Sequence, residues 1–172
     1  MNITHLHLLL NHFPIVGTLI GSGLLLWGIV KNQNNIKSIA AAILVLMALI
    51  AIPVYLSGEP AEESIEKLAG VSESAIEIHE HAAVLAIWLM GATGVAALVA
   101  LFLYRQKRPL VKTAFLAAFI LSVISFAAMA RTGYSGGQIR HSEISSGAAA
   151  SMENNHGHEN VSPGNERNND DD

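Results

Sequence analysis

Four long stretches without a charged residue constrain this chain more than any other feature of its sequence. No Asp, Glu, Lys or Arg precedes Lys31, and further uncharged stretches cover residues 38–58, 82–104 and 113–130. At about 1.5 Å per residue, helices of these lengths cross a hydrocarbon core of about 30 Å. The stretches also lack the polar face of a helix in a soluble bundle. The sequence therefore predicts an all-α protein, a bundle of four transmembrane helices.

The composition fits that prediction. Charged residues make up 14% of the 172 residues and hydrophobic residues 51%, whereas a soluble domain carries roughly a quarter charged residues. The absence of cysteine excludes disulfides, thiolate metal sites and thiol catalysis. The formal net charge of −4 argues against a nucleic-acid partner. We therefore expect the lipid bilayer, and no nucleic acid, as the main partner.

The positive charges predict how the bundle is oriented. The Lys and Arg residues of the two linkers that join span one to two and span three to four are Lys31, Lys37, Arg105, Lys107, Arg108 and Lys112. Neither linker contains an acidic residue, so both are expected in the cytoplasm. All 14 acidic residues then lie outside, together with Arg131 and Arg140. The prediction is a multi-pass protein of the plasma (inner) membrane with both termini extracytoplasmic.

The chain divides into a membrane domain and a polar tail. The membrane domain, residues 1–146, contains spans at about 8–30, 38–57, 80–104 and 112–130. The tail, residues 147–172, is polar, acidic and free of aromatic side chains, so it is predicted to be disordered. In the outer loop, Ile65, Leu68 and Val71 have the spacing of a short amphipathic surface helix.

Histidine is unusually frequent, with 8 residues against 3 Tyr and 2 Trp. Two lie in the tail, and the other six adjoin the outer ends of predicted spans: His5, His7, His12, His79, His81 and His141. Imidazole binds metal ions and haem iron, and four-helix bundles hold such centres between facing helices. For any single histidine, an interfacial anchor is the simpler interpretation. For His12, His79 and His141 in one layer, a bound haem or metal ion is equally well supported.

Helix geometry distinguishes His79 from His81. Residues two positions apart on a helix point about 200° away from each other, so the side chains of His79 and His81 cannot both face one centre. The face of His79 continues with the small residues Ala83 and Ala86, whereas the face of His81 carries bulky ones. We therefore expect His79 to point into the bundle, and His81 to be available to Glu77, four residues before it.

A faint internal repeat is present at an offset of 74 residues. It pairs His5 with His79, His7 with His81, Gly17 with Gly91, and Lys31 with Arg105. Such a pattern is typical of a duplicated two-helix unit whose halves are related by an axis along the membrane normal.

Three motifs together resemble a known bacterial family. They are HLHLLLNHFPIVG at 5–17, GEPAEESIEKLAGVSESAIEIHEHAA at 58–83 and RTGYSGGQIRHSEI at 131–144. The chain resembles, over about residues 5–144, the integral membrane proteins grouped as domain-of-unknown-function family 2231. That family has no assigned activity. Its architecture is similar to that of small membrane cytochromes b, which is an analogy of fold alone.

The resemblance implies where the site residues lie. In the first two motifs its pattern corresponds to His7, His12, Pro14, Glu59, Glu62 and His79. In the third it corresponds to Gly136, Gly137, Arg140, His141 and Glu143, with Ser142 where the pattern has proline. The two glycines would turn the chain back after the fourth span and set His141 over the bundle.

These considerations predict one site and one supporting network. The cofactor-binding or metal-binding candidates are His7, His12, His79 and His141, with Arg140 available to a carboxylate or a haem propionate. The candidate polar network consists of Glu59, Glu62, Glu80 and Glu143.

Two classes of function remain open. In the first, the histidines bind haem b or a transition-metal ion, and the protein exchanges electrons with a redox partner. In the second, the protein is a non-catalytic scaffold or accessory subunit, or a homo-oligomer, and the His, Glu and Arg side chains fix helix packing. No Ser-His-Asp arrangement or carboxylate pair is recognisable, so we expect an electron carrier or accessory subunit rather than an enzyme by itself. The uncharged spans argue against a coupled transporter.

Overall fold

The computed structural model describes residue 7 and residues 9–60 and 73–156, with side chains as far as residue 137 except at 73 and 75. Its long helices are α2 (His12–Val30), α3 (Asn34–Leu56), α5 (Glu73–Arg105) and α6 (Val111–His156). All four contain a segment that is long and apolar enough to cross a membrane. The described residues include no strand. The prediction of an all-α, four-helix membrane protein is therefore confirmed.

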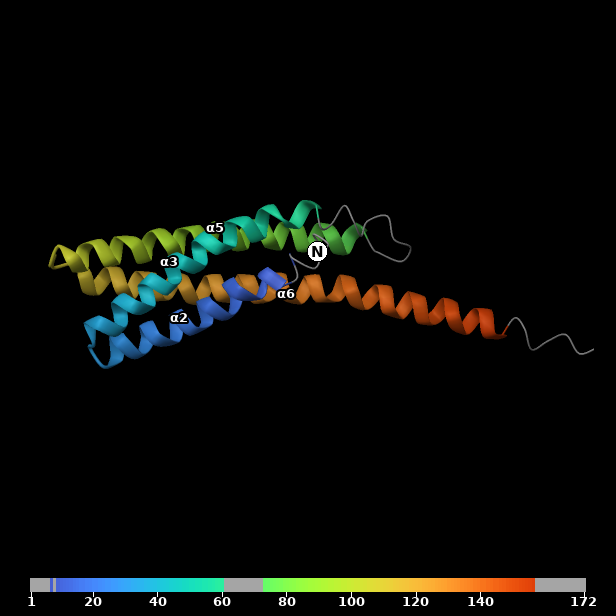
Figure 1. The fold of residues 1–172 in the computed structure, drawn as a ribbon, viewed down its shortest axis with the longest axis horizontal. Helices are drawn as coiled ribbons and strands as arrows, with labels where there is room; N and C mark the ends of the chain where they lie inside the picture. Colours follow the sequence, from blue (N-terminus) through green and yellow to red (C-terminus); the bar gives the residue numbers. More distant parts are fainter. Residues whose placement is uncertain (1–6, 8, 61–72, 157–172) are drawn as a thin grey trace, which may run out of the picture.

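The helices form two antiparallel hairpins, α2 with α3 and α5 with α6, that pack side by side (Figure 1). Both hairpins turn in the same way. Asn32 and Lys107 adopt positive φ angles of 50° and 49°, and the N–H of the next residue donates to a carbonyl five positions back, at Gly28 and Leu103. This is the Schellman ending of a helix.

Small residues allow close contacts both within and between the hairpins. A Cβ at Gly28 would lie 2.9 Å from the backbone nitrogen of Lys37, and one at Gly94 would lie 2.5 Å from the Cβ of Ala48. These contacts hold α2 on α3 and α5 on α3. Close backbone approach of this kind is how helices associate in lipid, where the hydrophobic effect does not drive them together.

Buried hydroxyl groups link the helices in the interior of the bundle. Ser22 of α2 donates to Ser122 of α6 across 2.8 Å, and Thr93 of α5 shares a hydrogen bond of 2.8 Å with Ser125 of α6. All four residues are buried. In a membrane interior such pairs satisfy polar groups that have no water to bind, and they join α6 to α2 and to α5.

Helix α6 does not end where the sequence analysis placed the end of the fourth span. It continues through Gly136 and Gly137 to His156 (Figure 1), so the expected turn at these glycines is wrong, and the expected tail from residue 147 begins as helix. Glycine lowers helix propensity without forbidding helix, and no proline interrupts residues 111–156. The surface helix expected around Ile65 to Val71 lies outside the described residues.

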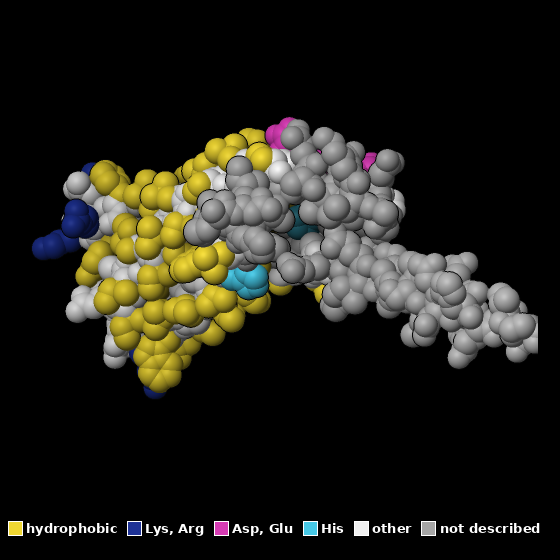
Figure 2. Space-filling model, turned by 45° about the vertical axis from the view of Figure 1, so that its right-hand side comes forward, with side chains coloured by type: hydrophobic (Ala, Val, Ile, Leu, Met, Phe, Trp, Pro, Cys, Tyr) yellow, Lys and Arg dark blue, Asp and Glu magenta, His cyan; other side chains and the backbone are white. Residues whose placement is uncertain are grey.

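The surface separates into three zones. Figure 2 shows Lys and Arg at one end, acidic and histidine side chains towards the other, and an apolar belt between them. We call the first the basic end, defined by the linkers at 31–33 and 106–110, and the second the histidine end, defined by His7 and His79. An apolar belt between two polar ends is the surface expected of a membrane-spanning bundle.

Candidate functional site

A cavity of about 780 Å³ opens at the histidine end of the bundle. All four helices contribute to it. Its polar lining residues are His7, Asn11, Tyr55, Glu59, Glu77, His79, Glu80 and Thr132, and the remaining lining is mostly apolar, including Met90 and Met129. A concave, largely apolar cavity of this size with a few polar groups is the usual form of a ligand site.

His79 enters the cavity from α5 in a fixed tautomer. Its Nδ1 lies 3.0 Å from the carbonyl oxygen of Thr132 and 3.1 Å from Oγ of Ser135, both on α6. Ser135 itself donates to the Thr132 carbonyl at 2.9 Å. A carbonyl only accepts hydrogen bonds, so Nδ1 carries the proton. The lone pair of the ring is therefore on Nε2.

His7 is held in the same manner from the start of the chain. Its Nδ1 lies 2.9 Å from Oγ of Ser57, and Ser57 donates to the carbonyl of Val54 at 2.8 Å. Because the hydroxyl hydrogen of Ser57 is used in the bond to Val54, the serine oxygen accepts the hydrogen bond from Nδ1 of His7. The lone pair of this imidazole also resides on Nε2.

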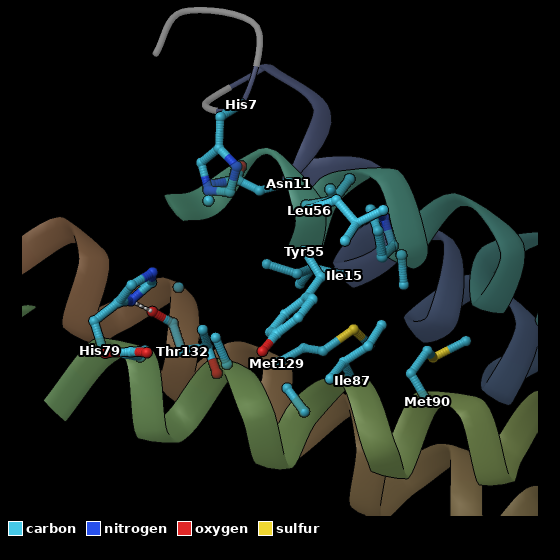
Figure 3. Close-up of a pocket in the computed structure, with 18 of the residues that line it drawn as sticks. His7, Asn11, Ile15, Tyr55, Leu56, His79, Ile87, Met90, Met129 and Thr132 are labelled. Atoms are coloured by element: carbon cyan, nitrogen blue, oxygen red, sulfur yellow. Dashed lines mark hydrogen bonds between the residues drawn. The ribbon is translucent and has the colours of Figure 1, made fainter. Parts of the chain in front are cut away.

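The two histidines face the same space. Figure 3 shows the rings of His7 and His79 extending towards one another across the cavity. Each lies near the beginning of the first helix of a hairpin, and each donates to a serine of the second helix or its cap, Ser57 directly after α3 and Ser135 within α6. The offset of 74 residues pairs His7 with His81, so the two histidines of the cavity are not equivalent positions of the repeat that the sequence suggests.

Oδ1 of Asn11, a residue of the cavity lining, is fully buried and has no hydrogen-bond partner among the described residues. The Nε2 atoms of His7 and His79 accept hydrogen bonds and do not donate, and the carboxylates of Glu59, Glu77 and Glu80 also line the cavity. Such a set favours a ligand that supplies hydrogen-bond donors or a Lewis acid.

Gly136 allows His79 to lie against α6. A Cβ at this position would meet Cε1 of His79 at 3.0 Å and Nδ1 at 3.2 Å. The glycine therefore serves close approach of the imidazole, and not the turn that the sequence suggested. Gly137 next to it is open, with no atom within 4 Å of such a Cβ.

Replacement of Gly136 by alanine is expected to displace the imidazole of His79 and weaken its hydrogen bond to Thr132. If His79 ligates a haem, the affinity for haem should fall by roughly 10–100-fold, the typical effect of losing an outer-shell partner of a ligating histidine. Haem titration of the purified protein measures it. Gly137→Ala is the matched control and should bind as the wild type does; equal affinities in both variants would contradict the role of Gly136.

Burial also affects His7. Desolvation lowers its pKa from the ordinary value of about 6.5, proximity to His79 lowers it further, and the backbone of Val54 partly opposes these effects. The folded protein therefore binds a proton at His7 less readily than the unfolded chain. The contribution of neutral His7 to stability is fully present above about pH 6.5 and is lost as the pH falls through the lowered pKa.

We expect the cofactor-free protein to unfold at lower temperature when the pH is lowered from 7.5 to 5.5, and His7→Gln to reduce this dependence. Thermal unfolding in detergent followed by circular dichroism provides the measurement. An unchanged pH dependence in the variant would show that His7 does not cause it.

The structure does not bring the other predicted site residues together in the cavity. His12 is exposed and is not part of the cavity lining, because it points away from the face of α2 that carries Pro14. Glu59 and Glu80 are exposed at the cavity's edge. Arg140, His141 and Glu143 lie on α6 where side chains are not described, and Glu62 lies outside the described residues.

The inward facing of His79 agrees with the helix geometry argued from the sequence. Ala86 and Met90 below it are buried, whereas His81 is exposed and its Nε2 lies 3.8 Å from Glu77. The orienting serines Ser57 and Ser135 were missed, since nothing in their local sequence marks a serine as the partner of a histidine some fifty residues away.

Comparison with protein-family models, curated proteins and solved structures found no match. The site is therefore assigned from its own geometry.

Proposed function

We propose that this chain is a membrane electron-transfer protein that holds a haem b between His7 and His79. The single observation that carries the proposal is the paired arrangement of the two imidazoles. Both have Nδ1 occupied by a hydrogen bond, and both direct Nε2 towards one cavity. A ligating histidine characteristically donates its other N–H to a carbonyl or a similar acceptor, which fixes its tautomer and orientation.

The ligand set favours haem over a metal ion held by protein alone. The described residues contain no group of three or more His, Cys, Asp and Glu that could hold a metal ion. Protein zinc sites take three or four such ligands, whereas haem iron takes one or two axial residues. Ala83 and Ala86 line the cavity on the His79 helix and leave room for a flat macrocycle. A transition-metal ion would need a further ligand, for which His141 is the candidate.

The charge distribution supports an extracytoplasmic site. All described Lys and Arg residues of the two linkers lie at the basic end, which the positive-inside bias assigns to the cytoplasm. The histidine end then faces outwards, and the haem would exchange electrons on that side.

An absorption spectrum of detergent-purified protein tests the proposal. After addition of haem, we expect a Soret band and, on reduction, the sharp bands of a six-coordinate low-spin iron with two nitrogen ligands. A protein that shows no Soret band after reconstitution, and no stoichiometric iron, copper or zinc, would overturn it.

A second candidate, a structural scaffold, is favoured by the same hydrogen bonds. The contacts of His7 with Ser57 and of His79 with Ser135 join the start of each hairpin to its second helix. If these contacts serve packing alone, the wild type should carry no cofactor. His79→Ala should then lower the stability of the bundle. A cofactor-loaded wild type would exclude this as the only role.

A further inference from the structure

Lys37 is a nearly buried cation at the basic end of the bundle. The residue is 4% exposed, and its Nζ donates to Oδ1 of Asn32 at 3.2 Å and to Oδ1 of Asn34 at 3.0 Å. The same Nζ lies 6.0 Å from the centre of the Phe115 ring on α6. Amide oxygens and an aromatic ring stabilise an ammonium group but carry no net negative charge. Among the described side chains, Lys37 therefore has neutral partners and no counter-ion.

Lys112 adds a second positive charge next to Lys37. It is the second residue of α6 and is exposed, and it shares a helix face with Phe115, three positions later. Lys37 reaches this face from α3, and the two ammonium groups repel one another. Each hairpin thus presents a cation to the other.

No carboxylate side chain in the described part of the chain lies close enough to compensate these charges. Figure 2 shows Lys and Arg at the basic end and the acidic side chains towards the histidine end. The acidic residue nearest to Lys37 in the sequence is Glu59, 22 residues away, which is roughly 33 Å along a helix. Electrostatic screening acts over about 8–10 Å at physiological salt. A buried charge without a counter-ion is costly, so the junction of α3 and α6 favours an anion.

The surface that continues from Lys112 into the membrane is apolar. Leu116, Ile120 and Val123 follow on one face of α6 and are 47%, 51% and 45% exposed. An anion at Lys112 therefore lies at the edge of a surface that acyl chains cover in a bilayer. A lipid with an anionic head matches both the charge and the apolar face, whereas inorganic phosphate matches the charge alone.

We propose that Lys112, supported by the charge of Lys37, binds the phosphate of an anionic phospholipid, with an acyl chain lying along Leu116 and Ile120. Because Lys37 is nearly buried, Lys112 makes the contact and Lys37 contributes its positive charge. The bound lipid offsets the repulsion between the two hairpins where α3 meets α6. This binding does not depend on the haem, which is proposed for the opposite end of the bundle.

Native mass spectrometry of the delipidated protein in detergent tests the proposal. The probes are dioleoylphosphatidylglycerol and dioleoylphosphatidylcholine, which share their acyl chains and differ in net charge. We expect the wild type to bind the phosphatidylglycerol at least about fivefold more tightly. Lys112→Gln should lose about that factor, the usual effect of one lysine near an anionic lipid surface.

Two further variants make the test specific to this position. Lys112→Arg keeps the charge and should bind the phosphatidylglycerol as the wild type does. Lys107→Gln is the matched control, because it removes the same charge from an exposed residue of the other linker at the basic end. Its affinity for both lipids should equal that of the wild type.

Three results would overturn the inference. Equal affinities of the wild type for the two lipids would show that the head-group charge is not recognised. Equal losses in Lys112→Gln and Lys107→Gln would show that the whole basic end attracts anions without a site at Lys112. Displacement of the phosphatidylglycerol by inorganic phosphate at constant ionic strength would make a free anion the ligand.

Discussion

Replacement of His79 by alanine is expected to abolish low-spin haem binding. In the proposed haem site, the variant loses one of the two Nε2 ligands and, with it, the side chain that Thr132 and Ser135 orient. Because loss of an outer-shell partner alone typically lowers affinity by roughly 10–100-fold, loss of the ligand itself should exceed about 100-fold. Haem titration gives the affinity, and the reduced spectrum gives the coordination state.

His12→Ala is the matched control for this experiment. His12 also lies at the histidine end and belongs to the same motif as His7, but it is exposed and outside the cavity lining. Its replacement should leave the spectrum and the affinity unchanged. Loss of haem in His12→Ala with retention in His79→Ala would refute the assignment of the ligands.

The second large effect is expected at Gly94, where α5 packs against α3. A Cβ at this position would lie 2.5 Å from the Cβ of Ala48, far inside the usual separation of about 3.5–4.0 Å between carbon atoms. Alanine has no rotamer by which either methyl group could move away, so the helices must separate. We expect Gly94→Ala to destabilise the bundle by about 1–3 kcal/mol, the usual cost of overpacking.

Gly91→Ala provides the comparison, one helical turn earlier on α5. Its Cβ would contact nothing within 4 Å, so only the helix propensity changes, which favours alanine by up to about 1 kcal/mol. This variant should be as stable as the wild type or slightly more so. Unfolding in mixed detergent micelles measures the stability of both variants. Equal stabilities of Gly94→Ala and Gly91→Ala would contradict the close contact of Gly94 with Ala48.

The sequence predicted correctly those features that depend on a single helical segment. Uncharged stretches long enough to cross a bilayer predicted the four helices, because a helix in lipid satisfies its own backbone and must be apolar over its whole length. The small residues below His79 predicted which way it faces, since positions on one helix have a fixed angular relation. The expected turn at Gly136 failed because glycine permits a turn without requiring one.

The identity of the site was decided only by the tertiary structure. The sequence grouped His7, His12, His79 and His141 by depth in the membrane, and depth does not specify the direction in which each helix face points. Packing of the two hairpins placed His7 opposite His79 and left His12 exposed. It also brought Ser57 and Ser135 to their histidines, across separations of 50 and 56 residues.

The sequence by itself thus determined the membrane-spanning bundle, through the length and hydrophobicity of each helix, which are properties of single segments. The tertiary structure alone decided which histidines face one cavity and which groups their rings bond, because these depend on the rotation and separation of helices far apart in the chain. Those quantities are set by small residues at the contacts, such as Gly28, Gly94 and Gly136, whose partners no local pattern reveals.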